Sequence, residues 1–145
     1  MTRLILILLF VTVPAQASAA CPKQAFLRSK AYSSYVEIYA GGRQLIDICL
    51  VRGTFNREGT QFSGSGYCTT TPEGELAFTI STELPRNAYD ARECIARVTG
   101  VSLISGGDPL PFSGTTTFSQ NGKTFDTVSF EGETGFHYVE RGTLQ

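Results

Sequence analysis

The chain has 145 residues, of which 41% are hydrophobic and 17% are charged, and its formal net charge is −1. A near-neutral surface gives no electrostatic reason to bind nucleic acid or an anionic membrane, so neither is expected as a partner.

The N-terminus has the pattern of a secretory signal peptide. Arg3 precedes an apolar run of ten residues, 4–13, which is too short to span a bilayer. Ala17-Ser18-Ala19 then fits the small-residue rule for signal cleavage. We therefore expect residues 1–20 to be removed and residues 21–145 to form one exported domain, in the periplasm or outside the cell.

The first part of the mature chain predicts two strands. Residues 25–28 form a short one, and residues 35–40 alternate as a longer one. The apolar face of the longer strand carries Val36, Ile38 and Ala40, and its other face carries Tyr35, Glu37 and Tyr39. Tyrosine is enriched at binding surfaces, so we interpret the second set as a candidate partner-binding strip. An ordinary outward strand face is the alternative.

Residues 43–71 predict a hairpin that follows a tight turn at Gly41-Gly42. Asn56-Arg57-Glu58-Gly59 supplies the turn of this hairpin, and centring it on Glu58-Gly59 fixes which residues face each other. The opposed pairs on one face are Cys49 with Cys68, Val51 with Gly66, Gly53 with Gly64 and Phe55 with Phe62. The glycines leave a hollow there, to be filled by a core phenylalanine or by a bound ligand.

Four cysteines in an exported chain predict two disulfides. The hairpin register favours Cys49–Cys68, with two free buried thiols as the alternative, and elimination leaves Cys21–Cys94. Lipid attachment at Cys21 is a further alternative for the N-terminus. It is disfavoured because it would leave an odd number of cysteines, and because Ser18 stands where a lipoprotein signal usually has an apolar residue.

Residues 76–81 predict a further strand, after which the pattern changes. Asn87 can cap a helix, and Gly100 can end one. Helical spacing relates Ala91, Cys94, Ile95 and Val98. We therefore expect one short helix near residues 88–98, with Cys94 on its buried side.

The C-terminal part returns to strand patterns at residues 101–104, 115–119, 124–130 and 136–140. Asn121-Gly122 predicts a hairpin turn that sets Phe118 opposite Phe125. About eight or nine short strands at regular spacing predict a mainly β fold. We expect a small antiparallel meander closed as a barrel, with a β-sandwich as the alternative.

No group of residues with catalytic or metal-binding spacing is evident. His137 is the only histidine and no G-x-S-x-G motif accompanies it, so we interpret it as a strand residue. Glu73 and Glu75 lie on a turn, where solvent exposure gives ordinary acidity. The sequence therefore predicts no catalytic residue, no metal site and no cofactor.

These patterns favour an exported, non-catalytic binding protein. Its partner would be a macromolecule, such as an unknown protein or an envelope component, or else a small apolar ligand. The alternatives are a small exported hydrolase that uses carboxylates and a structural subunit of an envelope assembly. Two carboxylates converging in one cleft would favour the hydrolase, and long unpaired strand edges would favour the subunit.

Overall fold

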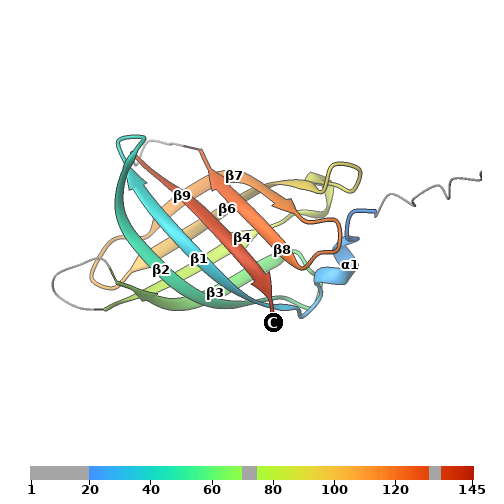
Figure 1. Ribbon diagram of the computed structural model, residues 1–145, viewed down its shortest axis with the longest axis horizontal. Coiled ribbons are helices and arrows are strands. Elements are labelled where there is room, and N and C mark those ends of the chain that lie inside the picture. Colours follow the sequence, from blue (N-terminus) through green and yellow to red (C-terminus); the bar gives the residue numbers. More distant parts are fainter. Residues whose placement is uncertain (1–19, 70–74, 131–134) are drawn as a thin grey trace, which may run out of the picture.

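The computed structural model describes residues 20–69, 75–130 and 135–145, which form a mainly β structure (Figure 1). The elements are α1 (Gln24–Leu27), β1 (Ala31–Ala40), β2 (Gln44–Phe55), β3 (Gln61–Cys68), β4 (Leu76–Glu83), the 3-10 turn η1 (Arg86–Ala88), β5 (Tyr89–Asp90), β6 (Ile95–Ile104), β7 (Leu110–Phe118), β8 (Thr124–Ser129) and β9 (Phe136–Leu144). The predicted signal segment up to residue 19, and Glu73, lie outside the described residues.

The nine strands form one antiparallel sheet in the order β4-β3-β2-β1-β9-β8-β7-β6-β5. A further pairing of β4 with β6 closes this sheet, so every strand except the short β5 belongs to a barrel. The predicted meander is therefore a barrel and not a sandwich. Figure 1 shows the strands tilted around the barrel axis, with α1 at one end.

The hairpin of β2 and β3 has the predicted register. Cys49 pairs with Cys68, and Phe55 pairs with Phe62. Gly59 makes the turn possible because its φ is +69°, a conformation that side chains with a Cβ rarely adopt. The hollow at Gly53 contains the ring of Phe62, whose Cζ would lie 2.2 Å from a Cβ added to that glycine. The expected filling by a core phenylalanine is confirmed.

Aromatic side chains fill the end of the barrel next to α1. The ring centroids of Phe55 and Phe62 lie 5.2 Å apart, and Phe125 lies 5.6 Å from Phe62 and 5.2 Å from Tyr32. Inward-facing glycines make room for such rings, since a Cβ at Gly142 would lie 2.1 Å from Phe125. Phenylalanine against glycine is therefore the recurring way in which this barrel packs its interior.

Both predicted disulfides, Cys49–Cys68 and Cys21–Cys94, are present. The second joins the segment before α1 to the turn before β6. Gln24 strengthens this end, because its side-chain amide donates to the carbonyl oxygens of Gly59 and Leu84. The sulfur of Cys21 is in the bridge, so it is not free to carry a lipid. Two disulfides are typical of proteins in an oxidising, exported location.

The helix predicted near residues 88–98 is wrong, and so is the short strand at residues 25–28. Tyr89 and Asp90 form β5, which turns back to pair with β6. Asp90 Oδ1 accepts a hydrogen bond from the Arg92 amide, and Cys94 has a φ of +60°, which no helix allows. The next ten residues alternate as β6 because that strand must pair with both β4 and β7 to close the barrel.

Residues 24–27 form the short helix α1 instead of a strand. Hydrogen bonds from the Phe26 amide to Lys23 O and from the Arg28 amide to Ala25 O close its turn. Leu27 is buried. None of the helices in the described ranges is long and apolar enough to cross a membrane.

Candidate functional site

The strip predicted on residues 35–40 lies on the outer side of β1. Val36 and Ile38 are buried inside the barrel, whereas Tyr35, Glu37 and Tyr39 are partly exposed on the outside. The strand is therefore oriented as its alternation indicates. The outward position makes all three side chains accessible to a partner.

Two side-chain contacts hold Tyr39 in place. It lies opposite His137 of β9, and the two rings are stacked with their centroids 4.8 Å apart and their planes 8° apart. The Tyr39 hydroxyl donates to Glu37 Oε2 at 2.5 Å. This hydrogen bond, with smaller contributions from burial and the carboxylate charge, raises the pKa of Tyr39. Both contacts fix the tyrosine in one orientation, so little side-chain entropy is left to lose on binding.

Tyr35 stands between an apolar and a charged neighbour. It pairs with Leu50 of β2 on one side and with Arg141 of β9 on the other. Arg141 Nε lies 3.8 Å from Asp126 Oδ1, and both side chains are more than 60% exposed. The strip therefore lies among apolar side chains, with a solvent-exposed ion pair on its β8 side.

Exposed apolar side chains continue from this strip onto the neighbouring strands. Leu50 and Phe130 are each 60% exposed, and Val128 of β8 is 47% exposed. We call this outer surface of β2, β1, β9 and β8 the aromatic face. Its residues are Leu45, Ile46, Ile48, Leu50, Tyr35, Glu37, Tyr39, His137, Val139, Val128 and Phe130.

The aromatic face holds most of the exposed large hydrophobic side chains in the described residues. The exceptions are Tyr67 on β3, and Val101 and Leu103 on β6, the strand opposite β1 in the closed strand order. Beside the face, an outer groove of about 710 Å³ has Leu50, Tyr67 and Arg52 among its walls. A continuous exposed apolar surface of this kind marks an interaction site in many proteins.

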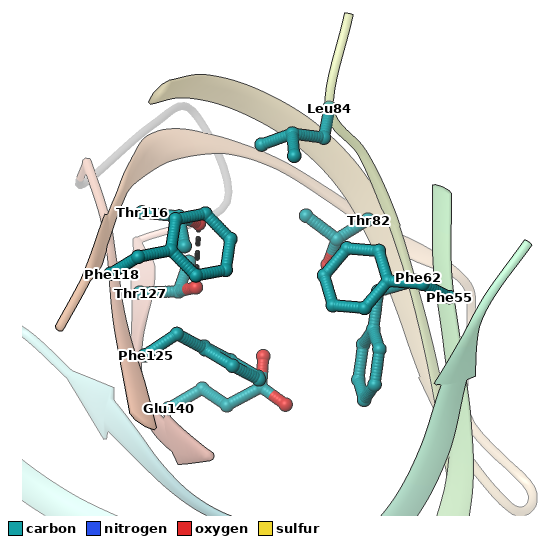
Figure 2. Close-up of a pocket in the computed structure, with 9 residues that line it drawn as sticks. All are labelled: Phe55, Phe62, Thr82, Leu84, Thr116, Phe118, Phe125, Thr127 and Glu140. Atoms are coloured by element: carbon teal, nitrogen blue, oxygen red, sulfur yellow. Dashed lines mark hydrogen bonds between the residues drawn. The ribbon is translucent and has the colours of Figure 1, made fainter. Parts of the chain in front are cut away.

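A second feature, which the sequence analysis did not identify, lies inside the barrel. Glu140 of β9 is only 2% exposed, and its carboxylate points into a small cavity (Figure 2). The cavity has a volume of about 10 Å³. Its walls are Phe55, Phe62, Phe118, Phe125, Leu84, Thr82, Thr116, Thr127 and Glu140.

Burial controls the acidity of Glu140. Loss of solvent raises its pKa from 4.5 to about 7, and the nearby Ser34 hydroxyl offsets this only in part. Thr116 of β7 and Thr127 of β8 share a hydrogen bond of 2.7 Å between their Oγ1 atoms. The sequence did hold a signal for this site, because strand alternation places Glu140 on the same side of β9 as Phe136 and Tyr138.

Neither Glu75 nor His137 lines the cavity beside Glu140. Glu75 is exposed before β4, as expected for a solvated turn. His137 is a strand residue of β9, as its sequence context indicated, and it contacts the predicted strip. Comparison with family models, curated protein sequences and solved structures found no match to this chain.

Proposed function

We propose that this protein is an exported, non-catalytic binding module that docks a protein partner on its aromatic face. The observation that supports this most strongly is the stacked Tyr39–His137 pair, which lies near the end of β1 beside the exposed apolar side chains of the aromatic face. Ordered tyrosines on such a surface are frequent hot spots of protein interfaces. Export, to the periplasm or the extracellular space, agrees with the two disulfides and with the N-terminal sequence pattern.

A protein partner fits the chemistry of the face better than a nucleic acid or a lipid surface. Glu37, Arg141 and Asp126 supply charges of both signs around the tyrosines. Removing residues 1–20, whose single charged side chain is Arg3, leaves 11 basic and 13 acidic side chains, a formal charge of −2. Apolar area with mixed charges at its margin is the composition that protein interfaces share.

A small apolar ligand inside the barrel has less support. Pockets for small ligands usually have volumes of about 300–1,000 Å³. The internal cavity has about 10 Å³, because phenylalanine rings occupy the rest of that end of the barrel. A partner would therefore bind outside the barrel.

The two alternative functions also have less support from the geometry. A hydrolase that uses carboxylates needs two of them in one cleft. Among the described residues, Glu140 is the one carboxylate side chain that lines the internal cavity, and none lines the outer groove. A subunit that assembles through strand addition needs an unpaired edge, and the pairing of β4 with β6 closes the barrel.

Capture from the native exported fraction tests the proposal. The bait proteins are the natural chain, the double variant Tyr35→Ser/Tyr39→Ser, and the control Leu103→Ser, which changes an exposed apolar residue on the opposite side of the barrel. Mass spectrometry should find a protein that the natural chain and Leu103→Ser retain and the double variant loses. A partner that all three baits retain equally would show that the aromatic face is not the docking surface.

A further inference from the structure

The cavity beside Glu140 has room for one small molecule. A volume of about 10 Å³ is close to the minimum that admits a water molecule when it is measured with a water-sized probe. A cavity lined by Leu, Ile and Phe stays dry even at about 150 Å³, because it offers no hydrogen bonds. This cavity is different, since polar side chains enter it from three directions (Figure 2).

Two of these side chains have polar atoms that make no hydrogen bond to the described residues: Glu140 Oε1, on a residue 2% exposed, and Thr82 Oγ1, on a residue 6% exposed. The Ser34 hydroxyl lies close enough to lower the pKa of Glu140, but it makes no hydrogen bond of ordinary geometry and leaves Oε1 open to another donor. A buried polar atom that lacks a hydrogen bond costs about 1–3 kcal/mol. A molecule that bonded both atoms would therefore be held strongly.

The pair formed by Thr116 and Thr127 offers the third contact. Either hydroxyl can be the donor in their shared bond, and one hydroxyl hydrogen of the pair is then left for another acceptor. Figure 2 shows these two threonines and Thr82 on different sides of the cavity, with the Glu140 carboxylate between the phenylalanine rings.

We propose that this cavity is a binding site for a single water molecule that links Glu140, Thr82 and the Thr116–Thr127 pair. The water donates one hydrogen to Glu140 Oε1 and accepts hydrogens from the Thr82 hydroxyl and from the threonine pair. This gives three hydrogen bonds, the usual number for a buried water. The water connects β4 with β7, β8 and β9 across the interior, where no direct side-chain hydrogen bond in the described residues does so.

Nuclear magnetic relaxation dispersion of solvent deuterium and oxygen-17 counts such waters, because a buried water exchanges slowly with bulk water. We expect the natural protein to hold one more long-lived water than Thr82→Val, which keeps the side-chain shape but removes the hydroxyl. Thr82→Ser keeps the hydroxyl and should restore the count. Glu140→Leu should lose the same water, whereas Glu140→Gln should keep it.

A high-resolution crystal structure gives an independent readout that does not depend on the variants. It should show one density peak within hydrogen-bonding distance of Glu140 Oε1 and Thr82 Oγ1. An equal count of long-lived waters in the natural protein and Thr82→Val would overturn the proposal, as would a cavity without density. If the density peak appeared only in crystals grown with sodium, the site would belong to a cation and the proposal would be wrong.

Discussion

Replacing Glu140 by glutamine should remove a pH dependence of the free energy of unfolding, which arises because this carboxyl is buried in the barrel. Burial raises the pKa of this carboxyl from 4.5 to about 7, while the unfolded chain exposes it to water. Between these two values the folded state binds a proton that the unfolded state has released. The free energy of unfolding therefore falls as the pH rises through this range, and the full stability is present below it.

The size of the effect follows from the shift. Each pKa unit corresponds to about 1.4 kcal/mol, so a shift from 4.5 to about 7 makes the loss on the order of 3 kcal/mol. Solvent screening does not reduce this free energy, because the Glu140 side chain is only 2% exposed. Two other inward-facing groups in the described residues, Tyr32 and Tyr138, have pKa values that burial raises, which keeps them protonated across this range.

Urea unfolding of the disulfide-intact protein at several values between about pH 4 and about pH 8 measures this dependence. Glu140→Gln and the natural protein should have similar stability at the acid end, and the variant should be more stable by up to about 3 kcal/mol at the alkaline end. Glu58→Gln, which changes an exposed carboxyl in a turn, should parallel the natural protein. Parallel curves for Glu140→Gln and the natural protein would refute the reasoning.

Three further results are expected. Replacing Cys21 and Cys94 by serine should lower the free energy of unfolding by about 4 kcal/mol in the chain-entropy model, which urea unfolding measures. Gly142→Ala should cost about 1–3 kcal/mol, because the added Cβ would lie 2.1 Å from Phe125, and adding Phe125→Leu should recover part of that loss if the clash is the cause. The intact mass of the exported protein should correspond to a start at Ala20 or Cys21, and a mass increment of three acyl chains would contradict this.

Local signals were enough to predict the hairpin of β2 and β3. The turn at Glu58-Gly59 fixes which residues are opposed, and alternation then places Cys49, Cys68 and the glycines on one side. A shift by one residue would have moved every side chain to the other face. The same reasoning gave the turn at Asn121-Gly122 and the pairing of Phe118 with Phe125.

The helix near residues 88–98 was predicted wrongly because its apolar spacing agrees with two structures. Ala96 and Val98 alternate as inward residues of β6, and β6 closes the barrel by pairing with β4. That pairing joins segments separated by a turn, a 3-10 helix and β5. Tertiary contacts of this kind decide between helix and strand, and local spacing does not contain them.

The candidate site could be predicted in part. Alternation along β1 was sufficient to place Tyr35, Glu37 and Tyr39 outside, and their role in binding stays a prediction. The stack of Tyr39 on His137 could not be predicted, because β1 and β9 lie near opposite ends of the mature chain and only the closed sheet pairs them. Glu140 was overlooked although its strand pattern placed it among inward aromatic residues.

The affinity of the captured partner for the double variant Tyr35→Ser/Tyr39→Ser tests the docking face most directly. Thermal melting comes first, and it should show little change, because surface substitutions usually cost within about 0.5 kcal/mol each. Calorimetric titration should then show binding weakened by more than about 1 kcal/mol, or about fivefold in Kd, with Leu103→Ser unchanged. Unchanged melting together with an unchanged Kd for the double variant would contradict a binding role for the aromatic face.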